Sequence, residues 1–168
     1  MTRGLRVWTD GACRGNGYDD AIGAAVAMFS WPLGRRKRRI LPRYSDPRPT
    51  SQRAELTGIV LALETALSAK QRGGKKGRFY ELIVNTDSRY AVGCMVDWLE
   101  GWKDRGWINS RGLPVANRDL IIEASDLVDE LEDEYSCSVY FNWIPREENT
   151  RADEFVKEVL DEADYDSD

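Results

Sequence analysis

The chain has 168 residues, 42% of them hydrophobic, which is enough for one domain with a sizeable core. It has no histidine, and its three cysteines form no CxxC pair. These counts exclude a disulfide framework, a thiolate zinc site and a nucleophile activated by histidine, so any bound metal is expected to have oxygen ligands. Because the chain shows neither a signal-peptide pattern nor an apolar run of about 20 residues, we expect a soluble, intracellular protein, nuclear or cytoplasmic.

The net charge of −5 comes from the C-terminal end, because residues 161–168 carry five acids and no base. Basic residues gather at 35–39, at 70–78 and around Lys103, Arg105 and Arg111. Such clusters can contact phosphate groups or simply form solvated surface, and the first, RRKRR, also resembles a nuclear localisation signal. We expect one domain over residues 1–163 and an acidic tail, 164–168, that frays.

The first third of the chain has the pattern of an antiparallel sheet. Apolar runs bounded by turn residues predict strands at 5–10, 21–31 and 38–44. We place the basic run 35–39 at the turn between the second and third strands, where Gly34 supplies the bend. These strands would form the antiparallel part of a sheet.

Helices and strands then alternate. Apolar residues at helical spacing predict a helix over 51–70 with Ser51 as its N-cap. A strand over 78–87 leads into a helix that begins at Ser88. The segment 101–114, rich in glycine, tryptophan and bases, predicts an irregular protrusion.

Three further elements complete the chain. Asn117 precedes an amphipathic helix, a strand follows at 138–144, and a last helix runs over 151–163. Alternation of strand, helix and strand implies parallel pairing. The fold class predicted is therefore α/β, with a mixed five-stranded sheet, three antiparallel strands followed by parallel ones, and helices on both faces.

Four acids occupy unusual positions in these elements. Asp10 and Asp87 end two predicted strands, each after Val-x-Thr, whereas Glu55 and Asp153 lie in early helical turns on the side that faces the sheet. All four would converge at one end of the sheet. Two unit charges about 4 Å apart repel by roughly 4 kcal/mol at an effective dielectric of about 20. Since no Lys or Arg adjoins the first three, we predict that Mg²⁺ or Mn²⁺ offsets the repulsion.

Each acid also has a structural explanation. Asp10 precedes a glycine and fits a turn, while Glu55 and Asp153 suit the positive end of a helix dipole. One shared site explains all four positions together, whereas the structural explanation needs four coincidences on one face. The metal site is therefore the interpretation that we favour.

Five segments, in order, resemble the motifs of type 1 ribonuclease H: TDGACRGNG, TSQRAEL, VNTDSRYAV, GWKDRGW and NTRADEF. The resemblance spans about residues 5–163. It implies cleavage of the RNA strand of RNA/DNA hybrids by two divalent ions, Mg²⁺ or its substitute Mn²⁺, leaving 5'-phosphate and 3'-hydroxyl ends. By the same resemblance Asp10 bridges both ions, Asp153 helps to hold the ion that activates water, and Glu55 and Asp87 hold the other.

The resemblance also implies three groups of substrate contacts. The first group would line the minor groove of the hybrid, where 2'-hydroxyls distinguish RNA from DNA. The second would form a pocket for a phosphate of the DNA strand, and the third a DNA-binding channel on the basic protrusion. Trp98, in the third group, also has a structural explanation, because a tryptophan on a helix is often a packing residue. The groups are, in turn, Cys13, Gly15, Asn16, Ser51 and Gln52; Arg48, Thr50 and Asn117; and Trp98, Trp102 and Ser110.

One motif departs from the family. Many members have a glycine-rich loop with a histidine before the last aspartate, whereas the loop before Asp153 is shorter here and has no histidine. Arg146, Glu147 and Glu148 lie nearest in sequence. We therefore expect an active but slower, or more Mn²⁺-dependent, enzyme.

We expect a monomeric endonuclease whose partner is an RNA/DNA hybrid, with no membrane partner. One alternative is another nuclease of the same superfamily, such as a junction resolvase or an exonuclease, which the GWKDRGW segment and the phosphate pocket disfavour. The other is a silent hybrid-binding module, which has little need for a buried group of acids.

Overall fold

The computed structural model describes residues 4–166, which contain one mixed five-stranded sheet. In spatial order β3-β2-β1-β4-β5, the first three strands pair antiparallel, and β4 and β5 extend the sheet in parallel. This confirms the predicted fold class and strand arrangement. The strands in chain order are β1 (Gly4–Arg14), β2 (Ile22–Phe29), β3 (Arg36–Leu41), β4 (Glu81–Thr86) and β5 (Ser138–Trp143).

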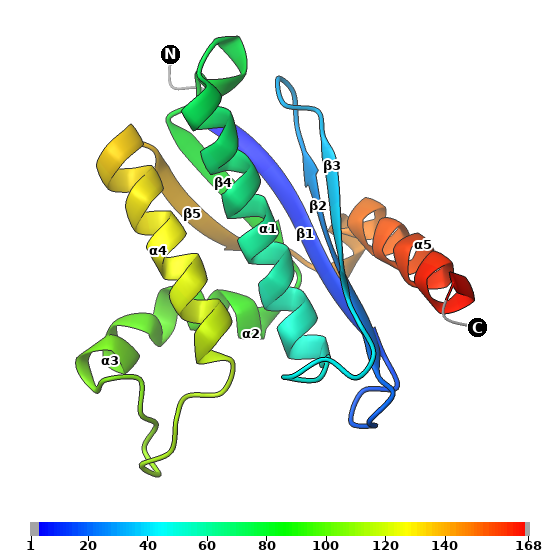
Figure 1. Ribbon diagram of the computed structural model, residues 1–168. Helices are drawn as coiled ribbons and strands as arrows, with labels where there is room; N and C mark the ends of the chain where they lie inside the picture. Colours follow the sequence, from blue (N-terminus) through cyan, green and yellow to red (C-terminus); the bar gives the residue numbers. More distant parts are fainter. Residues whose placement is uncertain (1–3, 167–168) are drawn as a thin grey trace.

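Helices cover both faces of this sheet (Figure 1). Helices α1 (Ser51–Arg72) and α4 (Arg118–Tyr135) pack on one face, and their apolar sides form the larger core with β1 and β4. Helix α5 (Thr150–Asp166) covers β1 and β2 on the other face and forms a second, smaller core there. On the sheet face that α5 covers, α5 lies away from β5, and Tyr140 is exposed on that strand.

The predicted protrusion is partly helical. After α2 (Arg89–Val92) the chain makes one π-helical segment, Gly93–Asp97, and then α3 (Leu99–Asp104). Short 3₁₀ turns at Lys75–Gly77 (η1) and Arg146–Glu148 (η3) connect other elements. Residues 105–114 form the irregular tip that the sequence predicts. No helix within residues 4–166 is long and apolar enough to cross a membrane.

Some boundaries differ from the prediction. The basic run does not form a hairpin turn, because Arg36 to Arg39 are paired with β2 as part of β3, while Gly34 does lie in the bend. The N-cap of α1 is Thr50, whose hydroxyl accepts a hydrogen bond from the Arg53 N–H at 3.1 Å, so the prediction of Ser51 was wrong by one residue.

The C-terminal helix extends further than its apolar stripe. Helix α5 continues through Asp166, and the carboxylate of Asp164 pairs with Arg14 and Arg43. Within the expected acidic tail, residues 164–166 are therefore helical, and residues 167 and 168 lie outside the described range. Ion pairs thus tie this end of α5 to Arg14 on β1 and to Arg43, which follows β3.

Candidate active site

The sheet brings the first two acids together. The parallel pairing of β1 with β4 ends at Thr9 and Thr86, so Asp10 and Asp87 are the next residues on two neighbouring strands. However, β1 itself continues to Arg14, because β2 still pairs with it on the other side. Asp10 therefore lies inside a strand, at the point where its neighbour β4 stops.

A glycine allows α1 to bring in the third acid. A Cβ atom on Gly11 would lie 2.2 Å from the Ala54 carbonyl carbon and 2.4 Å from the Glu55 nitrogen. Real side chains cannot approach a backbone this closely, so only glycine lets the first turns of α1 rest directly on β1. This close approach places Glu55 beside Asp10.

Three of the four predicted carboxylates form one compact group. Asp10, Glu55 and Asp87 each offer an oxygen, and these three oxygens lie within 4.8 Å of one another. Asp10 is only 5% exposed, and its Oδ1 accepts a hydrogen bond from the Gly11 N–H at 2.9 Å. The Oε2 atom of Glu55 is buried without a hydrogen-bond partner. A divalent cation fits this set, because it would satisfy that oxygen and offset the repulsion.

The group is electrostatically strained without a cation. Burial, and then the neighbouring Asp87 carboxylate, raise the pKa of Asp10 to about 7. Burial and the charge of Asp10 hold the pKa of Glu55 well above its usual range, and burial also raises the pKa of Asp87. These acids therefore retain protons at a pH where exposed carboxylates have lost them.

The fourth predicted ligand lies beside this group. Asp153 is in the first turn of α5, where its Oδ2 accepts a hydrogen bond from Lys157 Nζ at 2.8 Å. It is not among the three acids whose oxygens meet, but its charge raises the pKa values of Asp10 and Asp87. The structure thus places all four acids in one neighbourhood, with one of them paired to a lysine.

Two residues of the loop before α5 contribute polar groups that the sequence did not assign. The Arg146 guanidinium and a hydrogen bond from Asn149 both lower the pKa of Asp87, opposing the effect of burial. Asn149 also donates from Nδ2 to the Thr9 carbonyl oxygen at 3.0 Å. Its position just before a helix is a sequence signal for a cap, but not for these contacts. For Arg146, the sequence indicated only its place in the loop without histidine.

The expected groove residues come from two adjoining segments. Cys13 and Gly15 lie at the end of β1 and in the following turn, where Gly15 has a positive φ of 69°. The side-chain oxygen of Asn16 accepts a hydrogen bond from the Ser51 N–H at 3.2 Å, which holds this turn against the start of α1. Gln52 is exposed on the first turn of α1. The Asn16–Ser51 contact thus joins the β1–β2 turn to the start of α1, where the other expected groove residues lie.

The expected phosphate-pocket residues are only partly joined. Arg53 connects two of them, because its N–H donates to Thr50 Oγ1 and its Nη1 donates to Asn117 Oδ1 at 3.4 Å. Asn117 Nδ2 also donates to the Tyr90 hydroxyl at 2.9 Å. Arg48, the third member, is exposed and pairs with Asp19 at 3.0 Å. The structure thus links Thr50 and Asn117, and it turns Arg48 toward the β1–β2 turn.

The expected channel residues lie on the protrusion. Trp98 is 45% exposed, and its ring covers Gly93, where an added Cβ would lie 2.6 Å from it. Trp98 and Trp102 have ring centroids 5.7 Å apart, and Trp102 packs partly against the main core. Both tryptophans thus have a packing role while Trp98 keeps an open face, and Ser110 is exposed at the tip.

Comparison with known proteins decides the family. The family model for RNase H matches residues 2–161. The chain belongs to the ribonuclease H family. Membership of this family and the predicted enzyme class, ribonuclease H, are therefore confirmed. The chain is 33% identical to a ribonuclease H of Halorhodospira halophila over 94% of this chain and 93% of that protein. It is 29% identical to a ribonuclease H of Erythrobacter litoralis, over 94% and 96% of the two chains.

Solved structures support the same fold. The LC11 ribonuclease H1 in complex with an RNA/DNA hybrid superposes with a TM-score of 0.66 and 21% identity, over 95% of this chain and 98% of that one. LC9 ribonuclease H1, a type 1 enzyme with the type 2 active-site motif, has a TM-score of 0.62 and 26% identity, over 95% and 71% of the chains. The ribonuclease H fold is thus shared along nearly the whole chain.

Proposed function

We propose that this ribonuclease H hydrolyses the RNA strand of RNA/DNA hybrids as a metal-dependent endonuclease. The observation that carries the proposal is the group formed by Asp10, Glu55 and Asp87, with its buried, unpaired carboxylate oxygen. Apolar side chains could serve any structural purpose of this group equally well, so stability does not explain the acids. Their oxygens fit divalent cations. A related ribonuclease H1 has been solved with an RNA/DNA hybrid, which supports the substrate.

Asp10, Glu55, Asp87 and Asp153 would hold two divalent ions, Mg²⁺ or Mn²⁺. When bound, the ions supply activation of the attacking water and stabilisation of the leaving oxygen, and the products would carry 5'-phosphate and 3'-hydroxyl ends. For Asp153 to take part, its carboxylate has to leave Lys157 or share its oxygens with it. Because Lys157 is exposed on α5, that contact costs little to break.

The rest of the chain would orient the hybrid over these acids. Polar groups at the start of α1, including the side chain of Gln52 and the Asn16–Ser51 contact, are suited to 2'-hydroxyls in a minor groove. Thr50 and Asn117 lie where helix N-termini offer backbone N–H groups to a phosphate. The exposed face of Trp98 and the bases of the protrusion would bind the DNA strand.

The loop without histidine supports a slower enzyme, or one that depends more on Mn²⁺. The cation of this loop near the acids is Arg146, and a guanidinium does not exchange a proton with substrate as an imidazole does. At saturating Mg²⁺, where bound metal keeps the acids of the site ionised, we expect the rate to lack the titration of a histidine between about pH 6 and 7. A rate profile measured from pH 5 to 9 in each metal tests this, and a histidine-like inflection in Mg²⁺ would contradict it.

The decisive experiment is a cleavage assay on hybrid, duplex RNA, duplex DNA and single strands, with Mg²⁺, Mn²⁺ or EDTA. We expect cutting of the hybrid alone, and only with metal. Asp10→Asn should abolish it, and Asp126→Asn, an exposed acid on α4, should not. A chain that binds hybrid but cuts nothing in either metal would be a silent binding module, and cutting of duplex DNA would indicate another nuclease of the superfamily.

A further inference from the structure

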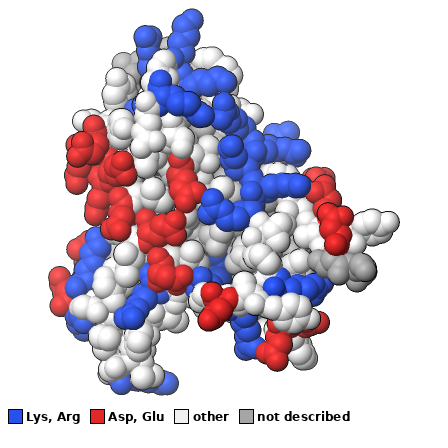
Figure 2. Space-filling view, in the orientation of Figure 1, with Lys and Arg blue, Asp and Glu red and all other residues white. Residues whose placement is uncertain are grey.

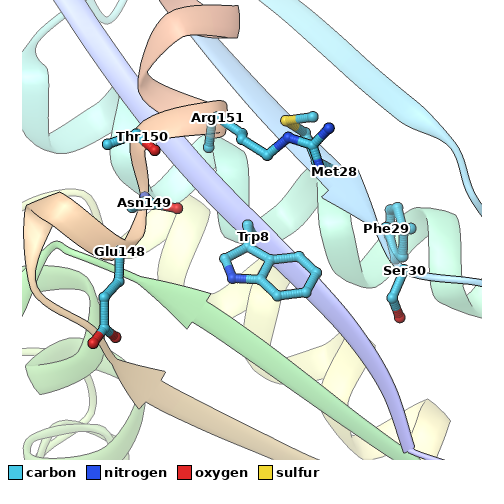
Figure 3. Close-up of a pocket in the computed structure, with 9 residues that line it drawn as sticks. Trp8, Met28, Phe29, Ser30, Glu148, Asn149, Thr150 and Arg151 are labelled. Carbon is cyan, nitrogen blue, oxygen red and sulfur yellow. The ribbon is translucent and has the colours of Figure 1, made fainter.

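A cavity of about 440 Å³ lies next to the group of acids but does not include them. It opens between β1, β2 and the first turn of α5, and Figure 3 shows the side chains around it. Trp8 stands two residues before Asp10 on β1, and Ala152 stands directly before Asp153. The cavity is lined by Trp8, Met28, Phe29, Ser30, Glu148, Asn149, Thr150, Arg151 and Ala152.

One buried side chain in this lining has an unused acceptor. Asn149 is 2% exposed, and its Oδ1 has no hydrogen-bond partner. Its Nδ2 donates to the Thr9 carbonyl, which can only accept, so the amide nitrogen has to face β1 and the oxygen has to face the other way. In Figure 3 this oxygen points to the side of the cavity where Trp8 lies. This oxygen is covered in the ligand-free protein, so a ligand with an N–H or O–H donor would satisfy it after a small side-chain movement of the lining.

The floor of the cavity suits a flat ring. Trp8 is half-buried, and its indole lies on the α5 face of the sheet, where Met28 is its neighbour across the β1–β2 pair (Figure 3). An aromatic ring stacks favourably on such a surface, and the volume is within the range of small-ligand pockets. The ligand would therefore combine a planar ring with a hydrogen-bond donor.

The rim of the cavity is suited to an anion. Thr150, Arg151 and Ala152 belong to the first turn of the 17-residue helix α5, where the backbone carries a partial positive charge. Arg151 is exposed, and no acid pairs with it among the residues that the structure describes. Glu148, the one acid of the lining, directs its carboxylate away from Trp8 in Figure 3.

We propose that this cavity binds a nucleotide. Its base would stack on Trp8 and donate a hydrogen bond to Asn149 Oδ1, and its phosphate would lie at Arg151 and the start of α5. The ligand is either a free nucleotide or a nucleotide of a nucleic-acid strand, because both present the same groups. The proposal does not depend on the hybrid being the substrate, since the acids are not part of the cavity.

The test is a titration of ¹⁵N-labelled protein in EDTA with AMP, followed by the indole and side-chain amide signals in NMR spectra. We expect saturable shifts of the Trp8 indole and the Asn149 amide, and smaller effects from ribose 5-phosphate, which has no base. Trp8→Leu and Arg151→Gln should each weaken AMP binding by about tenfold or more. Trp31→Leu is the matched control, because Trp31 is 79% exposed and outside the cavity lining.

A second arm identifies the source of the nucleotide. Displacement of AMP by single-stranded RNA would assign the cavity to a nucleotide of a strand, whereas simultaneous binding would assign it to a free nucleotide. The proposal is overturned if AMP shifts neither signal, or if Trp8→Leu and Arg151→Gln, shown to be folded by their spectra, bind AMP as the unmodified protein does. Cleavage of the hybrid is measured in parallel, so a failure here is distinct from a failure of the proposed function.

Discussion

At the scale of single residues, Asp10 has opposite effects on stability and on the proposed chemistry. Its folded pKa of about 7 lies above the usual value near 4, because it is buried beside Asp87. A group with a raised folded pKa stabilises the fold most when protonated, and this contribution is lost as pH rises from about 4 through 7. The metal-free protein should therefore become less stable between pH 5 and pH 8.

Asp10→Asn should remove this penalty and the activity together. We expect the variant in EDTA to be more stable than the unmodified protein by about 2 kcal/mol at pH 8, and by less at pH 5. Thermal unfolding at both pH values measures the difference, and Asp126→Asn serves as the control on exposed surface. An equal gain at the two pH values would mean that the Asp10 charge is not the cause.

At the scale of elements, the position of α1 on β1 decides whether Glu55 reaches Asp10. Gly11→Ala would put a methyl group 2.2 Å from the Ala54 backbone, so the start of α1 has to move away. We expect a loss of about 2–4 kcal/mol in the free energy of unfolding. We also expect a fall of about 100-fold in kcat, because a small displacement of a ligand disrupts the site.

Gly4→Ala is the control for this prediction. Gly4 lies on the same strand, where an added Cβ would make an ordinary 3.5 Å contact with Ile83. The stability and kcat of the Gly4→Ala variant should stay close to those of the unmodified protein. If Gly11→Ala also cut the hybrid at the full rate, the proposed dependence of the site on this close approach would be wrong.

The C-terminal end of α5 depends on ion pairs. Asp164 accepts from both Arg14 and Arg43 and is a third exposed, whereas Asp166 in the next half-turn is exposed. Asp164→Asn should therefore lower the free energy of unfolding by about 0.5–1 kcal/mol at low salt, and by less at high salt. Asp166→Asn should change it little. Urea unfolding at two salt concentrations compares the two variants.

At the scale of the whole molecule, the architecture could be predicted because buried apolar residues recur at the spacing of the helix or strand that carries them. Leu56, Ile59 and Leu63 recur at helical spacing, and all three are fully buried in α1. The end of β1 could not be predicted, since residues after Asp10 lack an apolar alternation and are paired only because β2 continues beside them.

Parts of the site depend on residues far apart in the chain. The acids could be selected from their positions in predicted elements, but the contact of Asn149 with Thr9 joins residues 140 positions apart. The approach of Gly11 to Ala54 is likewise a packing event that no local pattern encodes. Local patterns thus identify candidate ligands, and tertiary packing decides which of them meet and which polar atoms remain unpaired.

Two groups of bases on the surface should differ in function. Figure 2 shows Lys and Arg gathered over β3 and the C-terminal end of α1, where Arg35, Lys37 and Arg72 line a shallow groove. Arg72 lies 17 residues after Glu55 on α1, which corresponds to about 25 Å along the helix. Arg72 is therefore too far from the acids to hold the phosphates next to the cleavage site, whereas Lys103 and Arg105 belong to the protrusion.

Two charge-matched variants should separate these regions. Lys103→Gln with Arg105→Gln should raise KM for the hybrid by about tenfold at moderate salt and should reduce the slope of log affinity against log salt by about 0.9 per lost phosphate contact. Arg72→Gln with Lys75→Gln removes the same charge and should change KM by less than about twofold, because these residues lie at the far end of α1, where the remaining effect is long-range and screened. Steady-state cleavage of a short hybrid over a series of salt concentrations measures both, and an equal rise in KM for the two variants would show that net charge, rather than the protrusion, controls binding.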